Sequence, residues 1–376
     1  EEIVETKHKY LKSTKNKTLT SISFTDENEE IELRYELEPE GYTLKFEIIF
    51  NEPNKKENVT LHFNQKIKQL EKSLTNERYY SSIAYSKDNS SSDQLYDGKK
   101  KDISNVLWFS HTQQFFSTIL SSKQGFENSK FLVKEPDNDN YVKEFSSILH
   151  IKNRSLNNQD FTFYFVPNKY SLLTEYDQGF ESVIYLGHWI FSWVNKWFII
   201  PMFDLLEGWS LSYGLIILII AVVIKLILFL PTRSSYLSMA KMRVLKPEID
   251  ALNDKFKDPM EKQQAQMNLY KKTGVNPLGG CLPMLFQMPI LIALFSFFPT
   301  AYELRQQSFL WANDLSTYDA VLEFSFLPGY FDHLSLFALL MSISTLIQMI
   351  YSNQMSMSSN PQMPQMKYIM YIMPVV

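Results

Sequence analysis

The sequence predicts a multidomain protein in which an antiparallel β-sandwich precedes an α-helical polytopic membrane domain. Two observations predict this fold class. Segments in the first half of the 376 residues alternate apolar and polar side chains, the pattern of strands that bury one face. The apolar runs long enough to cross a bilayer all lie after residue 210. We therefore expect a β domain over 1–178, a linker with an amphipathic helix over 179–210, and the membrane domain over 211–376.

Strand patterns support the β domain. The segments IELRYEL (31–37) and YTLKFEIIF (42–50) alternate strictly and are separated by a turn at Glu40-Gly41, so they predict two neighbouring strands. Shorter runs at 59–63 and 161–166 are also typical of strands, and together they favour a sandwich. The serine- and lysine-rich stretch 87–102 predicts an exposed loop.

Composition excludes several classes of function. The formal net charge is -4 and no dense basic tract occurs, which argues against nucleic acid as a main partner. The single cysteine, Cys281, rules out an intrachain disulfide but leaves the compartment of the β domain open. The chain begins with Glu1 and ends inside an apolar segment, so we expect at least one further span beyond each end.

No chemistry-bearing motif is present in the sequence. His8, His62, His111 and His150 are scattered without metal-ligand spacing, so ordinary strand or surface positions are the favoured interpretation. We find no phosphate-binding glycine loop, zinc-binding helix motif or nucleophile elbow. The sequence therefore predicts no catalytic, cofactor-binding or metal-binding residue, and a protein that is not an enzyme.

An amphipathic helix is expected over residues 186–208. One stripe carries Leu186, Trp189, Ile190, Trp193, Val194, Trp197 and Phe198, whereas the other face carries His188, Ser192, Asn195 and Lys196. Tryptophans on one stripe favour a helix lying at the lipid headgroups. The alternative is a helix packed on the sandwich. Pro201 is expected to end or kink the helix.

Charge predicts the orientation of the membrane domain. Spans are expected at about 211–230, 279–300 and 334–351, with the start of another at 366–376. Lysines and arginines outnumber acids between residues 231 and 277, whereas acids dominate between 301 and 332. Because basic loops are retained in the cytoplasm, the first loop is inside, and the second loop and the β domain are outside.

The inside loop predicts a helical hairpin over 232–277. Apolar residues recur at helical spacing from Met239 to Phe256, interrupted only by Pro247, and a short turn follows. Asp258 is placed to cap the second helix, with Pro259 at its first position and Glu261 where a capping box needs it. Two antiparallel helices should therefore project into the cytoplasm.

Two polar residues stand within the apolar spans. Lys225 lies six residues before Pro231, about 9 Å inside the cytoplasmic end at the helical rise of about 1.5 Å per residue. Gln287, flanked by Pro283 and Pro289 in the next span, is expected at nearly the same depth. A lysine that merely snorkels to the headgroups is the alternative. Two polar groups at one level favour a hydrated pocket.

The segments YLSMAKMRVLKPEI and LYKKTGVNPLGGCLPMLFQMPILIALF resemble the cytoplasmic hairpin and following span of the YidC/Oxa/Alb family of membrane protein insertases. The likeness extends through ELRQQSFLWANDLS and MPQMKYIMYIMPVV, and the outer β domain is similar to that of the Gram-negative form. In this resemblance Lys225 falls where the family usually has a groove arginine, and Gln287 matches a groove-lining glutamine. Lysine keeps the charge but lacks the planar bidentate fork of arginine.

The resemblance implies an insertase and chaperone of the bacterial inner membrane, with its β domain in the periplasm. Nascent membrane proteins would enter a hydrophilic groove open to cytoplasm and lipid, beside Lys225 and Gln287. The implied partners are the Sec translocon (SecYEG and SecDF), the ribosome and the lipid bilayer. The resemblance implies no cofactor.

Two other classes compete with the insertase. A small-solute transporter or channel would use Lys225 as an anion site, although the spans show no detectable repeat. An envelope scaffold would leave Lys225 as a snorkelling residue. Capture of nascent apolar helices at Lys225 and Gln287 separates the insertase from both.

Overall fold

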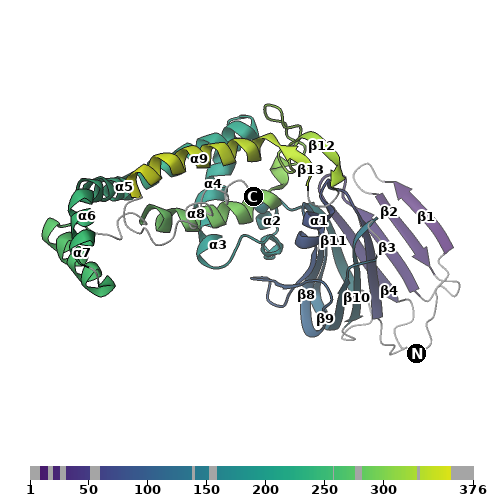
Figure 1. Cartoon of the computed structure of the whole chain (residues 1–376). Helices are drawn as coiled ribbons and strands as arrows, with labels where there is room; N and C mark the ends of the chain where they lie inside the picture. Colours follow the sequence, from purple (N-terminus) through teal and green to yellow (C-terminus); the bar gives the residue numbers. More distant parts are fainter. Residues whose placement is uncertain are drawn as a thin grey trace. The chain divides into compact units, whose positions relative to one another are not determined.

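The chain divides into two compact units in the computed structural model (Figure 1). We call residues 1–185 with 298–303 the β unit, and residues 186–297 with 304–376 the helical unit. The structure describes residues 9–15, 20–25, 31–50, 60–137, 140–151, 159–256, 258–275, 282–327 and 331–356. The predictions for His8, Cys281 and the segment 366–376 lie outside these residues.

The β unit is built on one branched antiparallel sheet, which bears out the predicted fold class. The strand order is β1-β2-β3-β4-β11-β9-β8-β6-β7, and β10 pairs with both β9 and β5. The first half of β9 pairs with β11 and its second half with β10, so two groups of strands share β8 and β9. Its strands are β1 Lys9–Lys15, β2 Thr20–Thr25, β3 Ile31–Leu37, β4 Thr43–Phe50, β5 Thr60–Lys68, β6 Ser82–Ser86, β7 Asp93–Leu95, β8 Lys100–Thr112, β9 Phe116–Lys134, β10 Tyr141–Ile151 and β11 Gln159–Pro167.

Aromatic side chains fill the core of this unit. The predicted strand pair 31–37 and 42–50 is present as β3 and β4, and its Tyr35 and Phe46 rings stack with centroids 4.8 Å apart. Alternation puts Phe46 in the core with Phe109 and Phe131. Gly125 lies between the part of β9 that pairs with β11 and the part that pairs with β10. It has a φ of +70°, and a Cβ there would approach the Val106 carbonyl oxygen to 3.0 Å. Glycine at this position therefore permits the close β8–β9 contact.

The predicted exposed loop over 87–102 is wrong at 93–95 and at 100–102, which are strand residues. Residues 93–95 form β7, and β8 begins at Lys100. The hydroxyl of Ser92 donates to the Ser182 carbonyl at 3.1 Å, and the Gln94 amide donates to the Val183 carbonyl at 3.0 Å. Polar composition suggested a solvated loop, but bonds to a segment about ninety residues away order this stretch.

The helical unit contains the apolar helices. Its described elements are α3 Ile190–Val194, the π-helix η2 Asn195–Ile199, α4 Ile200–Glu207, α5 Tyr213–Val244, α6 Lys246–Lys255, α7 Pro259–Thr273, α8 Leu282–Phe297, η5 Tyr302–Leu304 which begins in the β unit, the hairpin β12 Ala320–Leu327 and β13 Phe331–Ser335, and α9 Leu336–Ser356. The β unit adds α1 Leu74–Tyr80, α2 Tyr170–Glu175, η1 Phe180–Val183 and η4 Phe298–Thr300. The β12–β13 hairpin was not predicted, since only the charge of that loop was informative.

The first span continues into the hairpin without a break. Helix α5 runs through Pro231 to Val244, so the helix extends beyond the expected span at 211–230. Within the described residues, Tyr213–Leu230 is the one segment long and apolar enough to cross a membrane by length and composition. Leu285–Thr300 and Leu336–Gln348 are shorter apolar helices.

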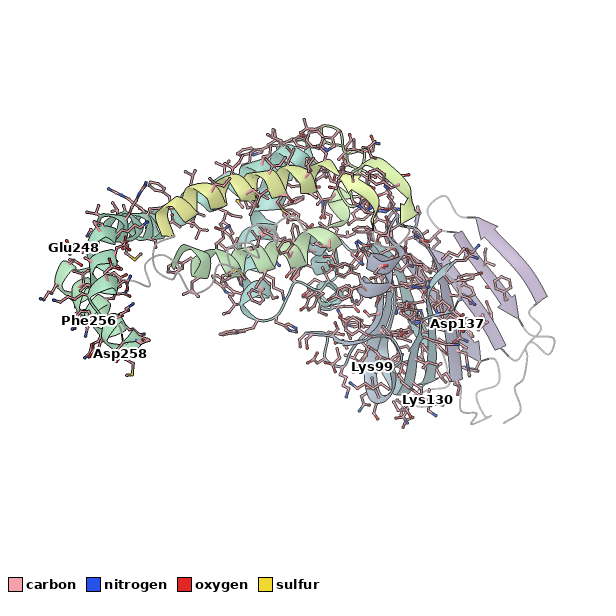
Figure 2. The ribbon with its side chains drawn as sticks, viewed as in Figure 1. Lys99, Lys130, Asp137, Glu248, Phe256 and Asp258 are labelled. Carbon is pink, nitrogen blue, oxygen red and sulfur yellow. The ribbon has the colours of Figure 1, made fainter. Side chains whose placement is uncertain are left out.

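The hairpin has the predicted antiparallel pair, made from α6 and α7. Phe256 and Asp258 lie at the turn between these helices (Figure 2). Asp258 caps α7 by accepting from the Met260 amide at 3.2 Å, as predicted, and Pro259 follows in the first turn. Pro247 stands in the first turn of α6, where its missing N–H costs nothing. The two helices close over buried Leu245 and Ile249.

Candidate groove between two apolar helices

Helix α5 has a buried face and an exposed face in the region of Lys225. Ile216, Ile220, Ile224 and Leu228 recur at every fourth position and are buried, because this spacing keeps them on one side of the helix. Lys225 comes directly after Ile224 of this buried stripe and is exposed. Its side chain therefore lies on the boundary between the packed face of α5 and its outward apolar face.

The structure brings Lys225 and Gln287 together. The ammonium of Lys225 on α5 donates to Oε1 of Gln287 on α8 at 3.4 Å, near the outer limit for a hydrogen bond. Residues 62 positions apart thus place their polar groups at one level of two neighbouring helices. An ammonium has three N–H donors, and this contact uses one of them.

The side chains next to this pair in sequence are apolar, and a backbone carbonyl adds one further polar group. Leu226 on α5, and Leu285 and Phe286 on α8, are large exposed side chains. Pro289 lies inside α8, so the carbonyl of residue 285 loses its usual backbone donor four residues later. A cation, an amide and a backbone carbonyl without its usual donor therefore lie within apolar stretches of two neighbouring helices. Such a group is the kind that water or a polar peptide segment can occupy.

Asn195 is a second polar residue of the helical unit, and its location differs from the one that the helical pattern predicts. It was assigned to the polar face, yet it is fully buried in the π-helical stretch η2. Its amide nitrogen donates at 2.9 Å to the carbonyls of Leu186 and Ala293, which ties η2 to α8. Pro201 stands in the first turn of α4, so of the two expectations, an end or a kink at Pro201, the structure excludes the end. An i→i+5 turn displaces residues from the 3.6-residue pattern on which the prediction relied.

The tryptophan stripe of the same segment is outward-facing. Trp189, Trp193 and Trp197 are 83%, 62% and 71% exposed. The headgroup location itself stays a prediction.

Asp319 organises the loop that precedes α9, and no sequence pattern singled it out. It accepts from the indole of Trp311 at 2.8 Å, from the amide of Phe337 at 2.9 Å, and from the hydroxyl of Ser335. Burial would raise the pKa of this carboxyl, but the three hydrogen bonds outweigh burial and lower it. Ser335 in turn accepts from the Ala338 amide, so the first turn of α9 has side-chain partners.

His111 is a buried histidine of the β unit. His111 lies in the core with Nδ1 3.0 Å from Gln65 Oε1 and Nε2 2.8 Å from Ser147 Oγ. Burial lowers the pKa of His111 to about 3. Within the described ranges, no group of three or more His, Cys, Asp or Glu side chains could hold a metal ion.

The β unit also contains a hollow of about 460 Å³. Its charged lining residues are Lys45, Lys123, Glu47 and Asp160. Two cations and two anions cancel, so this lining gives no preference for a ligand of either charge.

Two family models together match almost the entire chain. Residues 4–203 match the model described as the YidC periplasmic domain, and residues 205–376 match the model described as the 60Kd inner membrane protein. The first match covers the β unit up to Tyr185 and continues into α4, and the second covers α5 to α9.

Curated relatives give the same result. The chain is 39% identical to the membrane protein insertase YidC of Bacteroides fragilis over 99% of this chain and 64% of that protein. It is 40% identical to the protein of the same description from Phocaeicola vulgatus, over 92% and 59%, and 39% identical to that from Parabacteroides distasonis, over 94% and 60%. The chain thus spans about three fifths of the length of these relatives.

A solved structure of heparan sulfate lyase HepC from Pedobacter heparinus shares 8% identity over 43% of this chain and 22% of that chain. Its TM-score of 0.25 is too low to indicate a shared fold.

Proposed function

The chain belongs to the YidC family, and on this premise we propose that it acts as a membrane protein insertase of the bacterial inner membrane. It would cross that membrane several times, with the β unit in the periplasm and the α6–α7 hairpin in the cytoplasm. The transporter alternative is not favoured, because the similar curated proteins are described as insertases.

The observation that carries the proposal is the Lys225–Gln287 contact between α5 and α8. Lys225 is exposed, and its ammonium has two further N–H donors beyond the one given to Gln287. A carboxylate in the outer segment of an incoming chain would be attracted to this charge. The polar groups would also hydrate the site and lower the cost of carrying peptide backbone partway across the membrane.

The apolar part of the substrate would use the outward face of the same helices. Leu226, Leu285 and Phe286 offer hydrocarbon contact beside the polar pair. A nascent helix could therefore move from the groove into lipid while its polar segment crosses, without any covalent step. Docking of the ribosome and of the Sec translocon at the basic hairpin is part of the same proposal.

Two single-span substrates that differ only in an acidic or a basic outer tail provide the test. The whole protein, in cells depleted of their own insertase, is compared with Lys225→Arg, Lys225→Met and Lys225→Glu. We expect Lys225→Glu to slow insertion of the acidic-tail substrate by about tenfold, since one tenfold step corresponds to about 1.4 kcal/mol. The basic-tail substrate should be inserted as well as by the parent, and Lys225→Arg should insert both.

Expression and the extent of insertion are measured for each variant by protease protection. Lys130→Glu, a charge reversal at an exposed lysine of β9, serves as the matched control. Equal loss for both substrates would indicate a packing defect, and equal activity of all variants would remove Lys225 from the proposed mechanism.

A further inference from the structure

Four tyrosines gather on the surface of the β unit. Tyr79 is 68% exposed and Tyr96 is 40% exposed. The rings of Tyr79 and Tyr80 meet edge to face with centroids 5.0 Å apart. Burial raises the pKa of Tyr80 and of Tyr96, and the nearby hydroxyls of Tyr79 and Tyr185 raise both further. We call Tyr79, Tyr80, Tyr96 and Tyr185 the tyrosine edge.

Strand register explains why residues so far apart in sequence share this location. Helix α1 ends at Tyr80, two residues before Ser82, which pairs with Thr112 at the end of β8. The next residue of β6, Ile83, pairs with Leu95, so Tyr96 follows at the same end of β6. The tyrosines therefore lie where β6 begins and where β7 and β8 end.

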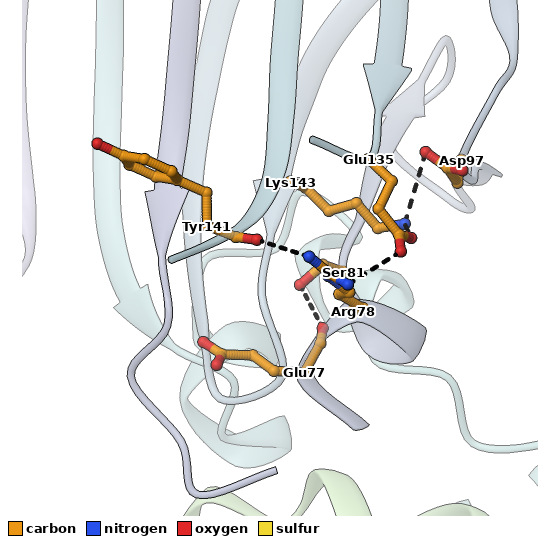
Figure 3. A network of polar contacts seen from close by, with 7 residues as sticks. All are labelled: Glu77, Arg78, Ser81, Asp97, Glu135, Tyr141 and Lys143. Atoms are coloured by element: carbon orange, nitrogen blue, oxygen red, sulfur yellow. Dashed lines mark hydrogen bonds and ion pairs between the residues drawn. The ribbon is translucent and has the colours of Figure 1, made fainter. Parts of the chain in front are cut away.

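A network of charged side chains holds the two main segments of the edge (Figure 3). Arg78, next to Tyr79, binds Glu135 at 3.2 Å and donates to the Tyr141 carbonyl. Lys143, only 3% exposed, binds Glu135 at 2.8 Å and approaches Asp97, next to Tyr96, at 3.6 Å. The tyrosines are thus presented by segments that are linked through Glu135 and Lys143.

The same end of the strands receives the chain from an apolar helix. Residues 298–303, which follow α8 directly, belong to the β unit. Gln114, in the turn after β8, donates to the Pro299 carbonyl at 2.8 Å, and the Phe116 ring packs on Tyr302 with centroids 5.5 Å apart. Pro299 lies only two residues beyond the end of α8, which allows at most about 7 Å of chain. Chain connection alone keeps this end of the sheet close to a helix that we propose to be in lipid.

The chain also passes from the β unit to the helical unit after Tyr185, which belongs to the tyrosine edge. Tyr185 is the last residue of the long segment of the β unit, and exposed Trp189 follows four residues later. A tyrosine ring is apolar with a polar tip, and such rings are enriched at the headgroup level of membranes. We propose that the tyrosine edge rests in the headgroup layer of the outer leaflet and holds the β unit against the membrane surface.

This lipid contact goes beyond the proposed insertase activity and needs no substrate. Leu70, 57% exposed, adds an apolar side chain beside the same helix, since its amide donates to the Glu77 carboxylate of α1. Tyrosines also serve at protein interfaces, so a protein partner is the competing occupant.

Nitroxide quenching in defined vesicles tests the contact. The whole protein, with Cys281→Ser and with Asn76→Cys on exposed α1 as its single cysteine, is labelled with a nitrobenzoxadiazole dye and reconstituted into vesicles of phosphatidylethanolamine and phosphatidylglycerol. A headgroup-nitroxide phosphatidylcholine is the quencher. The matched control is Glu127→Cys, also exposed, which lies roughly 26 Å along β9 from Glu135 at about 3.3 Å per residue.

We expect at least twofold stronger quenching at position 76 than at position 127, and loss of that difference when Tyr79→Ser and Tyr96→Ser are added. Equal quenching at both positions would overturn the proposal and leave a protein partner as the occupant. A difference that survives the serine substitutions would overturn the role of the tyrosines, since the chain connections would then suffice. Hydrogen exchange of β8 confirms that each variant is folded. Because no substrate is present, the result is independent of the insertase proposal.

Discussion

At the scale of single residues, polar side chains buried by distant contacts carry most of the unexpected information. His111 and Asn195 are both fully enclosed, and each makes hydrogen bonds with residues far away in sequence. A buried polar group is tolerated when its donors and acceptors find partners. Both residues should therefore be sensitive to changes that remove those partners or add charge.

The pH dependence of the β unit should follow His111. Its pKa of about 3 in the folded protein lies below the unfolded value of 6.5, so the unfolded chain binds more protons between these values. Stability is therefore full above pH 6.5 and is lost as the pH falls toward 3. We expect a loss of about 1 kcal/mol between pH 6.5 and 5.5.

Hydrogen exchange of β8 amides in the whole protein measures this loss. His111→Gln keeps polar contacts without titrating and should flatten the dependence, whereas the control His150→Gln should leave it unchanged. An unaltered slope in the His111 variant would show that other groups cause it.

Asn195→Leu should weaken the helical unit. The substitution removes both donors and leaves the Leu186 and Ala293 carbonyls buried without them. We expect a loss of about 1 to 3 kcal/mol, the usual effect of leaving buried polar groups unsatisfied. Thermal unfolding of the whole protein in detergent gives the change in Tm. Lys196→Leu, at the exposed neighbouring position, is the control and should shift the Tm little.

At the scale of elements, capping and irregular turns decide where helices begin and bend. Asp258 at the start of α7 was predicted because its cap is local in sequence. The contacts that start α9 were not predicted, since Asp319 reaches Phe337 across 18 positions. A cap of this kind depends on how the preceding loop folds.

Asp319→Ala should loosen the first turn of α9 together with the β12–β13 hairpin. It deprives the Trp311 indole, the Ser335 hydroxyl and the Phe337 amide of their common acceptor. We expect hydrogen exchange of the first turn of α9 to speed by about tenfold, which corresponds to about 1.4 kcal/mol. Asp254→Ala, at an exposed acid on α6, should not change this rate. Unchanged protection in the Asp319 variant would indicate that α9 starts without this carboxylate.

At the scale of the whole molecule, the two units meet different solvents in the proposed topology. The β unit would face the periplasm and the hairpin the cytoplasm, since basic residues are retained inside. A single cysteine at Glu127 in the β unit or at Met260, 77% exposed on α7, reports the side directly.

An impermeant maleimide should label Glu127→Cys in intact spheroplasts and Met260→Cys only in inverted vesicles. Solubilised protein, in which both cysteines should react, controls for accessibility. Labelling of both positions from the same side would rule out this topology.

The sequence by itself determined the features that depend on near neighbours. Alternation with period two predicted β3 and β4, and a run of apolar residues predicted the span within α5. The cap at Asp258 was also predicted, because its acceptor and donor are two residues apart. These patterns are local, so folding does not alter them.

Only the tertiary structure decided which distant residues meet. Asn195 is buried because a π-helical turn and α8 enclose it, and Ser92 and Gln94 in the predicted loop 87–102 are held by the carbonyls of residues 182 and 183. The tyrosine edge likewise comes from three separate segments. Contacts between residues many positions apart have no period or spacing in the sequence, so the packed chain alone defines them.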